Sequence, residues 1–233
     1  MITIGNPENL NDSLRIRVEN HLHESSLKFD QSSYLEKIVK KESRILDIGK
    51  SSRQLSTLLQ KTSQVYETLD LNSFGDYPDI RADICNIQLS QDLNRRYDII
   101  VCNSILEHCY DPITACKNLG NLLSDQGIII GSVPFLFPRH CPNDLQYQDY
   151  FRFTPDSIAI LFSEFDYTYT FSHRGRLTTA LLVSSLSYKY FFEARFRTLS
   201  RHLNKLLTNG RHSRQTASFD FLISRYELRN FND

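Results

Sequence analysis

The sequence is poor in several residue types that would mark a specialised class of protein. It has no tryptophan, one methionine and five cysteines without a CxxC pair, and its 27 basic side chains balance its 27 acidic ones. A formal net charge of zero provides no overall field that would attract nucleic acid or an anionic membrane. An odd cysteine count without close pairs is typical of a reducing compartment, so we expect a cytoplasmic protein.

Long apolar runs are also absent. No stretch reaches the roughly 18 apolar residues of a membrane span, because polar residues interrupt even the most apolar one, 177–192. Residues 1–13 lack the basic and apolar regions of a secretion signal. With 40% hydrophobic and 23% charged residues among 233, the composition is that of an ordinary globular protein that needs no disulfide or metal to fold.

The spacing of cysteines and histidines gives little support for a metal site. Cys102, Cys109 and Cys116 recur every seven residues, which could indicate a ligand stripe on a helix. Cys102 falls in an expected strand, however, and cysteine is a common small core residue. The histidines are scattered, and no His and carboxylate set has ligand spacing, so we predict no metal site.

From residue 33 onward, short apolar runs alternate with segments of helical periodicity, whereas residues 1–32 are weakly patterned and are expected to form an arm. This alternation predicts βαβ units and a largely parallel sheet within one domain, 33–233. The expected strands are 44–48, 65–71, 80–84, 97–102, one that begins at 128, 165–171 and 218–226. The expected helices are 33–41, 53–61, 112–123 and one that opens at 155, the last two after an Asp or Thr cap followed by proline.

The first three expected strands end in acidic residues, Asp47, Asp70 and Asp83. Parallel sheets bind ligands beyond the carboxyl ends of their strands. Gly49 lies between a strand and a helix, where free backbone N–H groups face a ligand. Asp70, about twenty residues later, is placed to accept hydrogen bonds from ribose hydroxyls, and Asp83 to meet an adenine amino group. The alternative for both carboxylates is a solvated loop position.

Two nucleotide-binding motifs are absent at this junction. Gly49-Lys50-Ser51 has the ending of a P-loop, but the required earlier glycine is replaced by Arg44. The GxGxxG fingerprint is missing as well, because Ser51 stands where its second glycine would be. A phosphate cradle and an NAD-dependent oxidoreductase are therefore disfavoured.

The order of the strand-end motifs resembles the class I S-adenosylmethionine-dependent methyltransferases, in a type 11-like branch with a Leu-Glu-His segment after the fourth strand and an Arg-Phe-Thr-Pro loop. This resemblance covers about residues 33–171 and implies an α/β, three-layer Rossmann-like fold with a mainly parallel seven-stranded sheet and S-adenosyl-L-methionine as cofactor. The segments that carry it are ILDIG (45–49), TLDLN (68–72), ADICN (82–86), YDIIVCNSILEHCYDP (97–112), GIIIGSVPF (127–135) and HCPNDLQYQDYFRFTPDSI (140–158).

The resemblance also implies the residues that hold the cofactor. Backbone beside Gly49 would face its methionine part, Asp70 its ribose, Leu71 its adenine and the Asn103 carbonyl its amine. Ser51 and Arg53 replace glycines that the family usually has, so this loop could crowd the cofactor or compensate with hydrogen bonds. A catalytically silent binding subunit therefore remains the alternative to an enzyme. The expected cofactor-binding residues are Asp47, Gly49, Lys50, Ser51, Asp70, Leu71, Asp83, Ile84, Asn103, Ser104 and His108.

The loop after the fifth strand is expected to meet the methyl acceptor. His140 and Asp149 are the candidate catalytic bases there, because a hydroxyl acceptor must lose a proton and histidine titrates near neutral pH. Tyr147, Tyr150 and Arg152 are the candidate acceptor-binding residues. A surface histidine and ordinary core aromatics are the alternatives. By analogy with the family, the predicted reaction is O-methylation of a small-molecule or sugar acceptor, in polysaccharide or secondary-metabolite biosynthesis.

A basic helical insertion is predicted at about 177–214. Residues 172–214 carry nine Lys or Arg and one acidic residue, Glu193, and apolar residues recur there at four–three spacing. This pattern fits a helix packed on the domain with a solvated basic face. It also fits a surface for a phosphate-bearing acceptor, a membrane or a protein partner. Nucleic acid is not expected as a partner, since no matching basic stripe occurs elsewhere.

Overall fold

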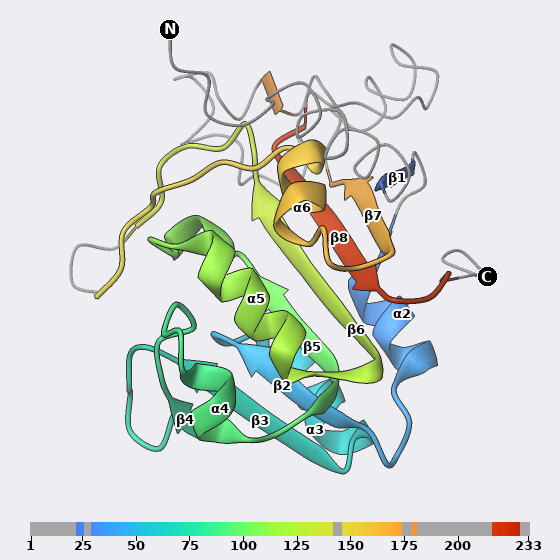
Figure 1. The fold of residues 1–233 in the computed structure, drawn as a ribbon, viewed down its shortest axis with the longest axis vertical. Coiled ribbons are helices and arrows are strands. Elements are labelled where there is room, and N and C mark those ends of the chain that lie inside the picture. Colours follow the sequence, from blue (N-terminus) through green and yellow to red (C-terminus); the bar gives the residue numbers. More distant parts are fainter. Residues whose placement is uncertain (1–21, 26–28, 142–145, 174–178, 181–215, 229–233) are drawn as a thin grey trace, which may run out of the picture.

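The computed structural model describes residues 22–25, 29–141, 146–173, 179–180 and 216–228, and within these ranges the chain forms one eight-stranded sheet (Figure 1). The order of the strands across the sheet is β1-β7-β8-β6-β5-β2-β3-β4. The strands are β1 (Leu22–Ser25), β2 (Arg44–Ile48), β3 (Val65–Asp70), β4 (Ile80–Arg81), β5 (Tyr97–Asn103), β6 (Leu123–Pro134), β7 (Tyr167–Ser172) and β8 (Ser218–Ser224).

The sheet is mainly parallel, as the sequence predicted. β2 pairs in parallel with β3 on one side and β5 on the other, and only β8 runs antiparallel to its neighbours β6 and β7. From β2, the chain adds β3 and β4 toward one edge of the sheet. It then returns to the other side of β2 with β5 and adds the later strands toward the opposite edge, so the direction of the strand order reverses between β2 and β5. Such a switch point opens a crevice beyond the strand ends.

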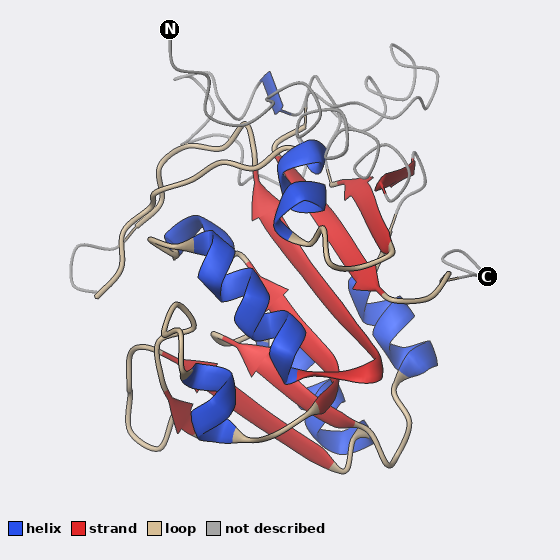
Figure 2. Ribbon diagram, viewed as in Figure 1, coloured by secondary structure: helices blue, strands red, loops and turns tan. Residues whose placement is uncertain are grey.

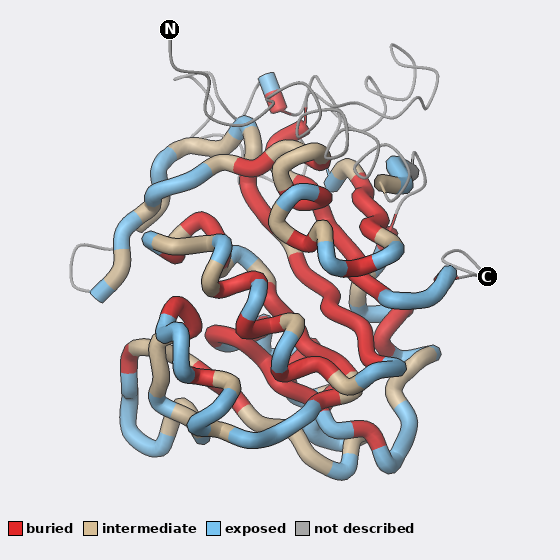
Figure 3. Tube along the Cα trace, viewed as in Figure 1, coloured by how far each residue is buried: buried red, intermediate tan, exposed pale blue. Residues whose placement is uncertain are grey.

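Helices cover both faces of the sheet and give the three layers that were predicted (Figure 2). Successive residues of a strand face opposite sides, so Ile45 and Ile99 pack with one set of helices, and Leu46 and Ile100 pack with the other. The central strands are accordingly buried on both faces (Figure 3). The helices are α2 (Gln31–Ile38) and α3 (Arg53–Thr62) behind the sheet in Figure 1, and α4 (Leu89–Leu93), the 3-10 turn η1 (Leu106–His108), α5 (Pro112–Leu122) and α6 (Pro155–Leu161).

The prediction of seven strands was wrong, because the described part of the chain has eight. The additional strand is β1, which pairs in parallel with β7 at the edge of the sheet, from Leu22 opposite Thr168 onward. It belongs to the region that we expected to be an arm, 1–32. Four residues at an edge give too short an alternation of apolar and polar side chains for a strand to be recognised from sequence.

The basic insertion predicted at 177–214 lies outside the described residues, apart from 179–180. None of the helices in the described ranges is long and apolar enough to cross a membrane. The five cysteines, all of them described, are free thiols, and Cys102, Cys109 and Cys116 lie buried in the core on β5, after η1 and on α5.

Helix α6 begins after the Thr154 cap that its Thr-Pro-Asp start predicted, and the cap takes the form of a capping box. The Thr154 hydroxyl accepts a hydrogen bond from the Ser157 amide, and the Ser157 hydroxyl accepts one from the Thr154 amide. We expect Thr154→Ala to lower the free energy of unfolding by about 1 kcal/mol, the usual worth of such a cap. Urea denaturation measures this loss. Thr57→Ala removes the same atoms from the exposed middle of α3 and should cost nothing.

Candidate active site

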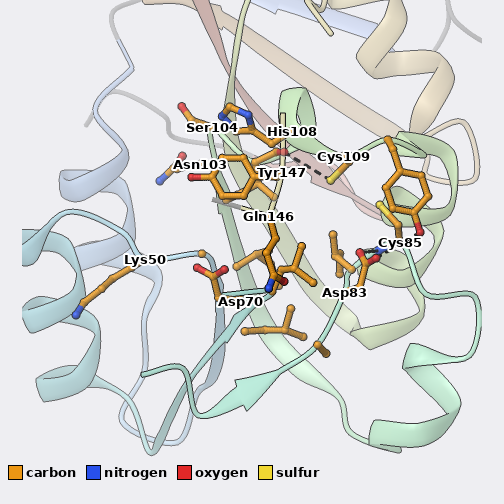
Figure 4. Close-up of a pocket in the computed structure, with 18 of the residues that line it drawn as sticks. Lys50, Asp70, Asp83, Cys85, Asn103, Ser104, His108, Cys109, Gln146 and Tyr147 are labelled. Atoms are coloured by element: carbon orange, nitrogen blue, oxygen red, sulfur yellow. Dashed lines mark hydrogen bonds between the residues drawn. The ribbon is translucent and has the colours of Figure 1, made fainter. Parts of the chain in front are cut away.

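A cavity of about 380 Å³ opens at the carboxyl ends of β2, β3 and β5 and beside the segment that follows β4 (Figure 4). Its size lies within the range of small-molecule sites. In Figure 4, Asp70 and Asp83 lie below Asn103, His108 and Tyr147, and the Lys50 side chain extends away from the others. Nine of the eleven predicted cofactor-binding residues line it: Gly49, Lys50, Asp70, Leu71, Asp83, Ile84, Asn103, Ser104 and His108.

Gly49 brings bare backbone to the edge of this cavity. Its φ of 70° lies in the left-handed region, a backbone conformation that residues with a side chain rarely adopt. A Cβ atom there would stand 2.6 Å from Ile105 Cδ1, on another residue that lines the cavity. The position therefore favours glycine for its backbone conformation, and any larger residue would also displace the Ile105 side chain.

Asp47 and Ser51, the other two predicted cofactor residues, support this loop from beneath. Asp47 is fully buried and accepts hydrogen bonds from the Ser51 hydroxyl (2.8 Å), the Ser51 amide (3.1 Å) and the Tyr66 hydroxyl (2.6 Å). Burial raises the pKa of Asp47, and the hydrogen bonds from Tyr66 and Ser51 oppose that rise. The serine that replaces a family glycine thus turns toward Asp47 and leaves the cavity open. Ser52 caps α3, and Arg53 begins it.

Tyr66→Phe tests this buried support. We expect the free energy of unfolding to fall by about 1.5–3 kcal/mol at pH 7, because the buried Asp47 carboxylate loses a hydrogen-bond donor. The loss should shrink as pH falls through the folded-state pKa of Asp47, which burial holds above the unfolded value of about 3.9, since the protonated carboxyl depends less on that donor. Denaturant unfolding at pH 7 and pH 4 measures the loss of stability and its dependence on pH. Tyr110→Phe is the matched control, because it removes an exposed hydroxyl that lies 3.3 Å from Asp83. Its free energy of unfolding should stay within about 0.5 kcal/mol of the wild-type value.

Asp70, at the end of β3, and Asp83, just after β4, are oriented by hydrogen bonds that leave free lone pairs on both carboxylates. The Asp70 carboxylate accepts from the Asn72 amide (2.9 Å) and the Tyr77 hydroxyl (2.7 Å). Asp83 accepts from the Cys85 amide at 2.8 Å. A carboxylate has about four acceptor positions, so each can also bind hydroxyl or amino groups in the cavity.

The end of β5 contributes an unsatisfied acceptor. Asn103 Oδ1 is buried and has no hydrogen-bond partner among the described residues, although Asn103 lines the cavity. The next residue, Ser104, has a φ of 54°, which is uncommon for a residue with a side chain. Strain and an unpaired polar atom together are typical of a binding site.

The loop after β6 folds over the cavity. It is fixed by backbone hydrogen bonds from Tyr150 to the Glu107 carbonyl (2.8 Å) and from Phe153 to the Pro134 carbonyl (3.0 Å). Tyr147 and Tyr150, two of the candidate acceptor-binding residues, line the cavity, and so does Gln146, which the sequence did not single out. The loop therefore forms one wall of the site.

His140, Asp149 and Arg152 do not line this cavity. Arg152 forms a bidentate ion pair with Asp149, and this pair holds the pKa of Asp149 well below its usual range. Asp149 also accepts a hydrogen bond from the His140 amide at 2.9 Å. A carboxylate so strongly held is a poor base, so the geometry favours Asp149 and Arg152 as an anchor for the His140 backbone.

A cluster that the sequence did not predict lies beside the cavity. The side chains of Glu107, His108 and His140 place one ligand-type atom each within 4.8 Å of one another. His108 lines the cavity and packs against the Tyr147 ring at 4.7 Å. Residues 108 and 140 are too far apart in sequence for ligand spacing to reveal them, and the adjacent Glu107-His108 pair was the only available signal.

Comparison with known proteins agrees with this geometry. Residues 23–172 match the model of a family described as "Methyltransferase domain". Since this is more than half of the chain, the protein belongs to the methyltransferase domain family. With the cavity described above, it is an S-adenosylmethionine-dependent methyltransferase. A search of curated proteins gave no match.

Solved structures of low sequence identity resemble the fold. The plantazolicin methyltransferase BamL, crystallised with a desmethylPZN analog and SAH, is 16% identical, and the match covers 94% of this chain and 87% of that chain with a TM-score of 0.45. The MccD protein is 13% identical, and the match covers 82% of this chain and 93% of that chain with a TM-score of 0.45. A putative methyltransferase from Bacillus halodurans C-125 is 11% identical, and the match covers 84% of this chain and 98% of that chain with a TM-score of 0.46.

Proposed function

We propose that the protein transfers a methyl group from S-adenosylmethionine to a hydroxyl group of a small-molecule or sugar acceptor. One observation carries the proposal: a single cavity is bounded by the acidic strand ends on one side and by the aromatic loop with Gln146, Tyr147 and Tyr150 on the other. A donor held at the strand ends and an acceptor held against the loop would meet there, and alignment of this kind supplies much of the catalysis of group transfer.

The residues fit the donor. Free acceptor positions on Asp70 and Asp83 support our assignment of ribose hydroxyls to Asp70 and of the adenine amino group to Asp83. Asn103, which also lines the cavity, is assigned to the amine through its carbonyl. When bound, S-adenosylmethionine supplies the electrophilic methyl group. The Leu-Glu-His segment, which suggested the type 11-like branch together with the Arg-Phe-Thr-Pro loop, forms η1, and the Arg-Phe-Thr-Pro loop leads from the acceptor loop into α6.

The preference for oxygen rests on the cluster beside the cavity. A hydroxyl must lose its proton on methylation, whereas a neutral amine attacks with its own lone pair, so O-methylation calls for a group that promotes deprotonation. Glu107 and His140 provide electron pairs next to His108, which lines the cavity, with Nε2 of His140 3.5 Å from Oε1 of Glu107. We therefore assign His140 to activation of the acceptor and Asp149 to its positioning.

An acceptor screen tests the proposal. The protein is incubated with isotopically labelled S-adenosylmethionine and matched sugars or phenols that carry either a hydroxyl or an amino group at one position. We expect label in the hydroxyl compounds, with the methyl group on oxygen by NMR, and no label with Asp70→Ala. Methylation confined to amino or carbon positions, or no product from any acceptor class, would contradict it.

A further inference from the structure

The Glu107 carboxylate is in an unusual position for an acidic side chain. It is fully buried, and neither of its oxygens has a hydrogen-bond partner in the part of the chain that the structure describes. Its backbone, in contrast, is tied to the acceptor loop through Tyr150 and Phe151. Because an isolated buried carboxylate is very unfavourable, such groups are paired with a cation or coordinate a metal.

Two imidazole rings face this carboxylate with their Nε2 atoms. Nε2 of His140 lies 3.5 Å and Nε2 of His108 3.9 Å from Glu107 Oε1. On the far side of each ring, Nδ1 lies near a backbone carbonyl oxygen, at 2.8 Å from Gln148 for His108 and 3.2 Å from Pro138 for His140. A carbonyl oxygen only accepts, so each Nδ1 carries the ring hydrogen, and in the neutral ring each Nε2 presents a lone pair.

When both rings are neutral, three electron pairs converge with no donor between them. Rings held by an Nδ1–H bond to a backbone carbonyl are characteristic of metal-binding histidines, because that bond fixes both tautomer and orientation. The three ligand-type atoms lie within 4.8 Å of one another. Ligands of tetrahedral Zn²⁺ with bonds of 2.0–2.1 Å are about 3.4 Å apart, so only small side-chain rotations would be needed.

We propose that Glu107, His108 and His140 bind a divalent transition-metal ion, with Zn²⁺ as the best-fitting example, at the wall of the methyltransferase cavity. Two imidazoles and one carboxylate suit such ions, whereas Mg²⁺ prefers oxygen ligands. Three protein ligands leave a coordination position open, as in catalytic zinc sites. The sequence had led us to expect no metal site, so this proposal replaces that expectation.

The position of the site indicates its role, a point that rests on the proposed methyl transfer. His108 lines the cavity, so an ion bound to it would lie beside an acceptor held there. Oxygen bound to such an ion is far more acidic than in water. The hydroxyl proton would leave to solvent, and the O–C bond would form as the S–C bond of the donor breaks. His140 would then activate the acceptor as a metal ligand rather than as the base predicted from sequence.

Metal titration tests the site without any acceptor. Protein freed of metal with a chelator is titrated with ZnCl₂ by calorimetry and with CoCl₂ by visible absorption, which reports the geometry around Co²⁺. We expect one site that weakens by at least about 100-fold in His140→Ala and in Glu107→Gln, since even outer-shell partners are worth about 10- to 100-fold. His173→Ala is the control: His173 also faces a carboxylate, Asp220 at 3.3 Å, but should leave this site unchanged.

The rival arrangement is a proton shared between His140 and Glu107, whose contact raises the pKa of His140. No metal binding to the wild type, or equal binding in His140→Ala, would overturn the proposal in favour of that ion pair. Titration of the same metal-free protein with S-adenosylhomocysteine separates the two proposals. Cofactor binding without metal binding would remove the metal site and leave the methyltransferase function standing.

Discussion

Asp70→Ala should weaken the binding of S-adenosylhomocysteine by at least about 100-fold. Asp70 ends β3 and lines the cavity, and its carboxylate is oriented by the Asn72 amide and the Tyr77 hydroxyl. Hydrogen bonds from two ribose hydroxyls to an ionised carboxylate are each worth about 1.5–3 kcal/mol. The loss of both corresponds to two or more decades in Kd. Isothermal titration calorimetry at fixed pH and salt measures it.

A nearby carboxylate provides the control for charge. Asp76→Ala removes the same group from an exposed position in the same β3–β4 connection, outside the cavity. Its Kd should match that of the wild type. Equal weakening in both variants would mean that charge near the site, and not a ribose contact, is what matters. Unchanged binding in Asp70→Ala would remove Asp70 from the cofactor site.

Gly49→Val should also remove most of the cofactor affinity and lower stability. A branched side chain at a φ of 70° is strongly disfavoured, and its Cβ would stand 2.6 Å from Ile105 Cδ1. Ile105 can relieve that contact only by moving at the cavity wall. We expect the free energy of unfolding to fall by about 2–3 kcal/mol and binding of S-adenosylhomocysteine to become undetectable at micromolar protein.

Gly75→Val separates strain from the effect on the cavity. Gly75 has a similar φ of 62°, but a Cβ there would meet no atom within 4 Å. This variant should lose stability through backbone strain alone and should keep its affinity for S-adenosylhomocysteine. If Gly49→Val bound the cofactor as well as Gly75→Val does, the close backbone approach at Gly49 would not be part of the site.

The strands that carry the site could be predicted because their signals are local. The runs that end at Ile48 and Cys102 are largely apolar, and buried parallel strands require such runs. The run that ends at Asp70 is more polar and only partly buried, but it is rich in strand-forming residues. The strand-end acids Asp70 and Asp83 then followed from the common direction of those strands. Strand β1 could not be predicted, because its pairing with β7 depends on a partner almost 150 residues later in the chain.

The acceptor side was harder to predict, because it depends on how a loop folds back. Tyr147 and Tyr150 reach the cavity, whereas Asp149, between them, turns away to Arg152. In an irregular loop, side chains do not point to alternate sides with a fixed period. The sequence could therefore not separate the residues that face the cavity from those that turn away from it. The Glu107, His108 and His140 cluster likewise arises only because backbone hydrogen bonds from Tyr150 and Phe151 bring the loop to η1.

The direction of the Ser51 side chain bears on a departure from the family pattern. A serine in place of the usual glycine left two outcomes open, crowding of the cofactor or compensating hydrogen bonds. Its side chain instead donates to buried Asp47 at 2.8 Å, which stiffens the loop beneath Gly49. The direction of one short side chain decides between the two outcomes, and only the structure shows it.

Calorimetric titration of the wild-type protein with S-adenosylhomocysteine tests the central claim most directly. The cavity at the strand ends, with Asp70, Asp83 and the unpaired Asn103 Oδ1, predicts one site per chain with a micromolar Kd and a higher melting temperature in the presence of the ligand. No heat and no thermal stabilisation at millimolar S-adenosylhomocysteine would contradict the claim that this cavity holds the methyl donor.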